Sequence, residues 1–169
     1  MTVIILQVLT VCISLSSLVL GIWNSIRENK KNRYIEIVTK QRLDNKSKVS
    51  ASAKILLQYA NAETKEYIDN EYIKQCALAL SEIKAILKTC YPEDRAVLQS
   101  GEKLLCAYVS YLRGETDFAT IAKAGELFHQ KYSVYDLADW RFIKNQAEGK
   151  KFDSADFDVL YKDTEKEFI

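Results

Sequence analysis

A long uncharged stretch at the start of the chain constrains the fold more than any other feature. Thr2–Trp23 holds 22 residues without a charged side chain. As a helix it would be roughly 33 Å long, which matches a hydrocarbon core of about 30 Å. Nothing basic precedes it, so a cleaved signal peptide is the weaker explanation. The sequence therefore predicts a transmembrane helix.

Basic residues set the expected orientation of this helix. Four of them follow it closely: Arg27, Lys30, Lys31 and Arg33. Because positive charge accumulates on the cytoplasmic side of a bacterial inner membrane, we expect the N-terminus outside and the rest of the chain in the cytoplasm.

Polar and small side chains recur within the stretch at intervals of three and four residues: Gln7, Thr10, Ser14, Ser17 and Gly21. In lipid, small residues let helices approach closely and polar side chains hydrogen-bond between helices. The spacing predicts that membrane helices associate through this face, by self-assembly or with a partner helix. Two alternatives are that the hydroxyls bond back to their own backbone, or that the face lines a pore.

The segment that follows is strongly basic. Residues 27–54 carry a net charge of +6, whereas residues 55–169 carry −5. Anionic lipid headgroups would attract such a segment, so we expect lipid contacts and no nucleic-acid partner. Arg42 and Asn45 lie on a face with the same three-four spacing, where polar residues can set the register of an oligomer. The alternative to a role in oligomer register is that this helix is simply solvated. We also expect the helix to bend at residues 29–32.

The remaining sequence has helical periodicity throughout. Apolar faces predict helices over about 69–89 and 92–113, a helix from about residue 116 with a break near Ser133, and a short helix after Ser154. The predicted fold is all-α, with one N-terminal transmembrane helix continuing into a cytoplasmic bundle of four to six helices. The expected divisions are an anchor at 1–26, a basic juxtamembrane helix at 27–62 and a helical domain at 63–169.

Catalytic signatures are missing from the sequence. Its one histidine, His129, has no partner at a catalytic or metal-binding spacing, and no phosphate-binding or nucleophile motif occurs. Three cysteines, Cys76, Cys90 and Cys106, fall on apolar helix faces and are expected to be reduced core residues. We therefore predict no enzyme activity, no metal and no cofactor.

Aromatic residues are concentrated in the second half of the chain. Too many fall within residues 132–142 for all of them to face inward. We expect a partner-binding patch, because aromatic residues and arginine are enriched at protein interfaces. Its proposed members are Tyr132, Tyr135, Trp140 and Arg141. Ordinary core packing is the alternative.

Two short motifs, Thr39-Lys40-Gln41-Arg42 and Tyr91-Pro92-Glu93-Asp94, carry a family resemblance. With the N-terminal apolar stretch, they make residues 2–112 similar to a loose group of uncharacterised bacterial single-span membrane proteins. Those proteins tend to have Trp three residues after the arginine, where this chain has Asn45. Some of them lie in phage-defence loci, and the resemblance implies an effector that damages the cell envelope.

Together these features predict a non-enzymatic, oligomerising inner-membrane protein whose cytoplasmic domain receives a protein partner or signal. In the effector hypothesis, assembly disrupts the membrane during antiphage defence. The alternative is a passive membrane tether that scaffolds a cytoplasmic complex. The expected partners are membrane lipids, further copies of the chain and a cytoplasmic protein.

Overall fold

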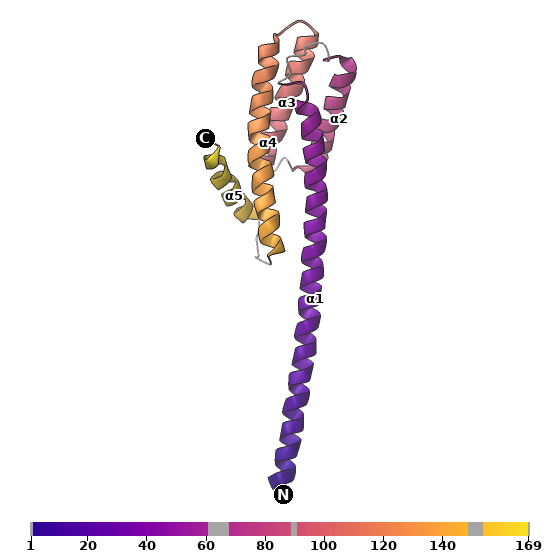
Figure 1. The fold of residues 1–169 in the computed structure, drawn as a ribbon, viewed down its shortest axis with the longest axis vertical. Coiled ribbons are helices and arrows are strands. Elements are labelled where there is room, and N and C mark those ends of the chain that lie inside the picture. The colour runs from indigo at the N-terminus through magenta and orange to yellow at the C-terminus, as the bar shows by residue number, and fades with distance from the viewer. Residues whose placement is uncertain (1, 61–67, 89–90, 149–153, 169) are drawn as a thin grey trace. The chain divides into compact units, whose positions relative to one another are not determined.

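The computed structural model describes residues 2–60, 68–88, 91–148 and 154–168; the side chains of 2–14, 154 and 155 lie outside this description. No strand occurs among the described residues, which confirms the all-α class for them (Figure 1). The helices in chain order are α1 (Thr2–Leu57), α2 (Asn70–Ile86), α3 (Pro92–Leu112), α4 (Phe118–Ala147) and α5 (Ser154–Glu167).

The chain divides into two compact units, Met1–Lys40 and Gln41–Ile169. The first unit consists of the N-terminal part of α1. The second contains the C-terminal part of α1 together with α2, α3, α4 and α5. Helix α1 continues through residues 29–32, where a bend was expected, because neither proline nor glycine interrupts its hydrogen bonding there.

The predicted transmembrane helix is not found. Among the described residues, no helix is both long enough and apolar enough to cross a membrane. From Leu15, the first described side chain of α1, the uncharged stretch extends 12 residues to Ile26, about 18 Å, before Arg27 and Glu28. This finding overturns the prediction of a transmembrane helix over Thr2–Trp23. The expected inner-membrane location remains a prediction.

The core of the second unit is built around the C-terminal part of α1. Val49, Ala53 and Leu56 are at most 3% exposed and pack with buried residues of α2, α3 and α4. Their spacing of four and three residues places them on one face of the helix. The same face carries Ser52, whose hydroxyl hydrogen-bonds Glu82 at 2.7 Å. Burial of this face fixes the rotation of α1 against the other helices.

Two tyrosine hydroxyls hold the C-terminal end of α1. The Tyr108 hydroxyl donates to the Leu56 carbonyl at 2.9 Å, and the Tyr72 hydroxyl donates to the Ile55 carbonyl at 2.8 Å. The last carbonyls of a helix have no N–H four residues on within the helix. The Tyr108 hydroxyl therefore satisfies the Leu56 carbonyl, while the Ile55 carbonyl also accepts from the Gln58 backbone N–H at 3.3 Å. The two tyrosine rings pack edge to face, 5.3 Å between centroids. The contact joins α1, α2 and α3.

Helices α2 and α3 begin with clear signals in the sequence. The Asp69 carboxylate accepts a hydrogen bond from the Tyr72 backbone N–H at 2.7 Å and so caps α2. Pro92 lies in the first turn of α3, where its missing N–H is not needed. Both helices lie within two or three residues of the predicted bounds.

Helix α4 is a single helix through Ser133, where a break was expected. It follows a turn in which Gly114 has a φ of +74°, a conformation that favours glycine. Buried Gly125 lets α4 approach the end of α1, because a Cβ built there would lie 2.4 Å from the Ala60 Cβ. Helix α5 packs on α4 through Tyr161, which clusters with Val134 and Ala138.

We predict that Tyr108→Phe lowers the free energy of unfolding by about 1–2 kcal/mol, because the Leu56 carbonyl stays buried without this hydroxyl. Urea denaturation followed by circular dichroism measures the change. Tyr34→Phe is the matched control, since Tyr34 is 69% exposed and its substitution should leave stability within about 0.5 kcal/mol of wild type. Equal stability of the two variants would contradict the role assigned to this hydrogen bond.

Candidate functional site

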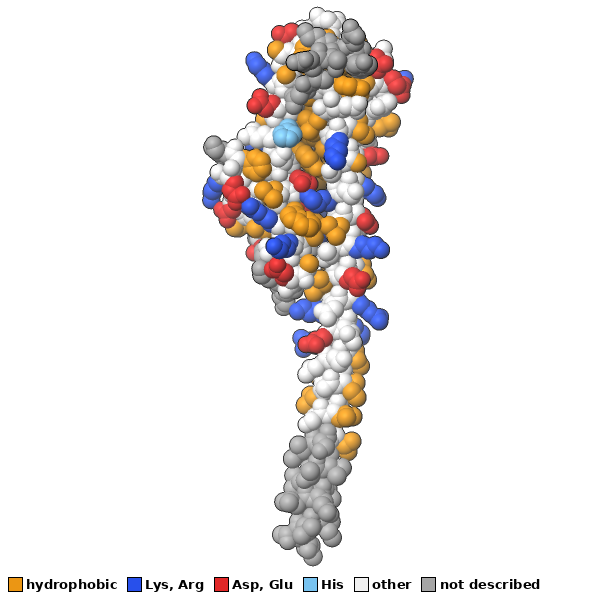
Figure 2. Space-filling view, in the orientation of Figure 1, with side chains coloured by type: hydrophobic (Ala, Val, Ile, Leu, Met, Phe, Trp, Pro, Cys, Tyr) orange, Lys and Arg blue, Asp and Glu red, His pale blue; other side chains and the backbone are white. Residues whose placement is uncertain are grey.

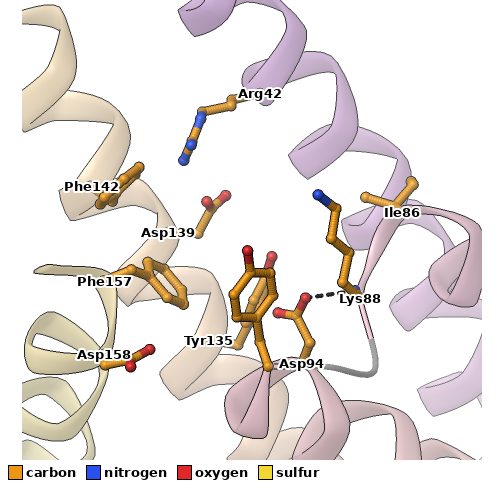
Figure 3. Close-up of a pocket in the computed structure, with 10 residues that line it drawn as sticks. Arg42, Ile86, Lys88, Asp94, Tyr135, Asp139, Phe142, Phe157 and Asp158 are labelled. Atoms are coloured by element: carbon orange, nitrogen blue, oxygen red, sulfur yellow. Dashed lines mark hydrogen bonds between the residues drawn. The ribbon is translucent and has the colours of Figure 1, made fainter. Parts of the chain in front are cut away.

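A half-open pocket of about 390 Å³ lies within the second unit (Figure 3). Its volume falls in the range of pockets that hold small ligands, about 300–1,000 Å³. Side chains from α1, the α2–α3 connection, α4 and α5 surround it: Arg42, Ile86, Lys88, Tyr91, Asp94, Tyr135, Asp139, Phe142, Phe157 and Asp158.

Aromatic rings form the apolar part of the pocket. Phe157 of α5 packs edge to face against two rings of α4, with centroids 6.0 Å from Tyr135 and 5.6 Å from Phe142. Edge-to-face packing of this kind is favourable and holds the rings in defined orientations. Tyr91 adds a fourth ring at the start of α3 and is 39% exposed. The pocket wall therefore presents fixed aromatic surface beside charged groups.

Asp94 has a structural role in the pocket. It lies in the first turn of α3, is 8% exposed and accepts a hydrogen bond from the Lys88 backbone N–H at 2.7 Å. Burial raises the pKa of its carboxyl group above the usual value, while this hydrogen bond acts in the opposite direction. The bond ties the end of α2 to the start of α3 and so fixes that side of the pocket.

Arg42 brings positive charge into the pocket from α1. Its guanidinium carbon lies 4.3 Å from the centroid of the Phe142 ring, which is a cation–π contact. Figure 3 shows Arg42 extending from α1 toward Phe142 and Asp139. The guanidinium group of Arg42 is thus a flat cation that already packs on an aromatic ring of the pocket.

Asp139 is the least compensated charged group of the pocket. In the part of the chain that the structure describes, its carboxylate has no hydrogen-bond or ion-pair partner, whereas neighbouring Asp136 is paired with Lys46. Burial raises the pKa of Asp139 to about 6. Lys46 and Arg42 lower it, and the carboxylates of Asp136 and Asp94 raise it further. The positive charges of Lys46 and Arg42 therefore do not fully offset the cost of burying the ionised form of Asp139.

The structure separates the four residues of the predicted partner-binding patch. Tyr135 lines the pocket, while the Tyr132 ring stacks on Phe128 and its hydroxyl donates to Asp136. Trp140 is 48% exposed. Arg141 donates to both carboxylate oxygens of Glu167 and to the Thr164 hydroxyl, which fastens α5 to α4.

The other predicted site residues lie mainly on α1. Arg42 lines the pocket and Asn45 is half-buried nearby on the same helix. The remaining described ones are exposed: Ser17, Gly21, Arg27, Lys30, Lys31 and Arg33. The side chains of Gln7, Thr10 and Ser14 lie outside the described residues.

Sequence reasoning missed most of the pocket. Asp139 was not among the predicted site residues, yet it lies four residues after Tyr135 and three before Phe142, on the aromatic face. That spacing was the available signal. Cys106 is exposed, so its prediction as a core residue was wrong, while Cys76 is buried as predicted. Cys90 lies outside the described residues.

A second candidate surface lies on α1 in the first unit (Figure 2). Seven large apolar side chains between residues 15 and 26 are exposed, and five of them, 48–63% exposed, share one side of the helix: Leu15, Leu18, Val19, Ile22 and Ile26. At 100° per residue they fall within an arc of about 100°, which makes them one stripe along the helix. We call them the apolar stripe. Ser17, Gly21 and Asn24 lie on the opposite side together with exposed Leu20, and exposed Trp23 lies beside the stripe.

Comparison of the chain with protein-family models, with curated proteins and with solved structures gives no significant match.

We predict that the ionisation of Asp139 destabilises the folded chain. Its pKa is higher in the folded than in the unfolded state, so stability falls as pH rises from about 4 to about 6. Asp139→Asn cannot ionise and should escape this loss. Relative to wild type, its free energy of unfolding should rise by about 1–3 kcal/mol between pH 4 and pH 7 in urea titrations.

Asp44→Asn is the control for this measurement, because Asp44 is an exposed aspartate on the same helix as Arg42. The change with pH, relative to wild type, should be larger for Asp139→Asn than for this control. Equal changes for the two variants would contradict the raised pKa of Asp139.

Proposed function

We propose that this chain is a non-enzymatic protein that associates with copies of itself through α1 and receives a partner through its helical second unit. The apolar stripe is the observation that carries the proposal. Contiguous exposed apolar surface of this kind marks interaction sites, because leaving it in water is unfavourable. The commonest symmetric partner for such a surface is a second copy of the same chain.

The spacing of the stripe supports helix-to-helix association. Leu15, Val19, Ile22 and Ile26 are separated by four, three and four residues, which is the spacing of the apolar positions in a coiled coil. Two copies would bury about ten such side chains at roughly 1 kcal/mol each. Bringing two chains together costs about 4–15 kcal/mol. Because the two terms are similar in size, we expect reversible association rather than a permanent dimer.

The face of α1 proposed here for self-association differs from the face predicted from the sequence. The polar and small residues Ser17 and Gly21 were expected to associate because apolar side chains gain nothing by leaving lipid tails. That argument depended on a spanning helix, and the proposal rests instead on the opposite, apolar face. The membrane-disrupting role also required a spanning helix and is not part of the proposal. A role in phage defence remains a prediction from the resemblance.

A pair of photocrosslinking variants tests which face associates. The photoreactive residue p-benzoyl-phenylalanine replaces Ile22 on the stripe in one variant and Asn24, nearly opposite on the same turn, in the other. After irradiation of intact cells, we expect a dimer of the chain from position 22 and little or none from position 24. Mass spectrometry of the crosslinked peptides verifies that both halves come from this chain.

Two outcomes would contradict the proposal. A dimer from position 24 without one from position 22 would assign association to the polar face. The absence of any dimer from both positions, at protein levels equal to wild type, would mean that the chain does not associate through this part of α1.

A further inference from the structure

We propose that the pocket between α1, α4 and α5 binds a small organic cation, an ammonium or guanidinium group on a short aliphatic stem. The inference is independent of self-association, because every lining residue belongs to the second unit. It rests on the balance of charge, on the aromatic walls and on the volume of the pocket.

The charges that line the pocket favour a cation. Asp94, Asp139 and Asp158 face two basic side chains, Arg42 and Lys88. Arg42 is held against the Phe142 ring, and Lys88 is exposed at the pocket edge. The Asp139 carboxylate has no partner among the described residues, and a cation placed beside it would supply the missing one.

The aromatic walls favour the same kind of ligand. The faces of aromatic rings attract cations, and the contact gains strength where water is excluded. Arg42 over Phe142 is an example of this contact within the pocket itself. Tyr135 and Phe157 offer further aromatic surface next to Asp139 and Asp158. An aliphatic stem would pack on these rings while the charged group reaches a carboxylate.

A bare metal ion fits the pocket less well. Among the described residues, no group of three or more histidine, cysteine or carboxylate side chains converges closely enough to hold one. The pocket volume of about 390 Å³ is also far larger than a metal site. An organic cation fills the space and uses both the carboxylates and the rings.

Binding of a cation should be linked to the proton on Asp139. The ligand favours the charged carboxylate, as Lys46 and Arg42 already do, against burial and against the carboxylates of Asp94 and Asp136. Affinity should therefore increase as pH rises from 5 to 7, by up to about tenfold for a pKa near 6.

Isothermal titration calorimetry of the full chain with agmatine tests the proposal, because agmatine carries a guanidinium and an amine on a four-carbon stem. We expect saturable binding at pH 7 that weakens at least tenfold in Asp139→Asn. Asp163→Asn, an exposed aspartate of α5 outside the pocket, is the matched control and should bind as wild type does. Phe157→Leu, which keeps an apolar side chain but removes a ring, should weaken binding several-fold.

A short capped peptide with a single arginine and no other charge distinguishes the source of the cation. Binding of agmatine and peptide alike supports recognition of an arginine side chain on a partner protein. Binding of agmatine alone supports a free small amine. No binding of either would overturn the proposal, as would equal affinity of wild type and Asp139→Asn, or binding of inorganic phosphate in place of the cations.

Discussion

The structure depends on how the C-terminal end of α1 is held. Its last carbonyls, at Ile55 and Leu56, accept hydrogen bonds from the hydroxyls of Tyr72 and Tyr108, and its apolar face packs into the core. This contact fixes both the rotation and the axial position of the helix. Arg42 lies 14 residues before Leu56, about 21 Å along the same rigid helix, and so reaches the pocket at a defined height. The position of Arg42 in the pocket is therefore set by the packing of an apolar core.

At the pocket, the packing that stabilises the second unit also buries a destabilising carboxylate. Burial of aromatic rings stabilises the packing of α5 on α4, but it also removes Asp139 from water. A carboxylate in such a place lowers stability at neutral pH unless something compensates it. Carboxylates with a perturbed pKa in clefts are typical of functional sites. This is why the pocket, rather than the exposed aromatic Trp140, is the more informative feature of the second unit.

Much of the helical architecture could be predicted from the sequence. The apolar period of α2, the proline that opens α3 and the glycine after it are local signals, and local signals determine where helices begin and end. Ser133 was mistaken for a break, but serine within a long helix is tolerated when no proline or glycine accompanies it. The pocket was harder to predict because Asp94, Asp139 and Asp158 come from three helices, and their proximity depends on packing. The transmembrane prediction was wrong, since no helix among the described residues is both long enough and apolar enough to cross a membrane.

The apolar stripe of α1 is a contiguous surface that the described chain does not bury, and a second copy of the chain is the partner proposed to cover it. Capture of differently tagged copies tests this directly: two tagged forms are expressed in the same cells, one is captured, and recovery of the other is measured. We expect recovery for wild type, loss of recovery in Leu18→Glu/Ile22→Glu, and recovery in Leu78→Glu, which alters a similarly exposed leucine of α2. No recovery of the second copy with wild type, or undiminished recovery with the stripe variant, would contradict self-association through the stripe.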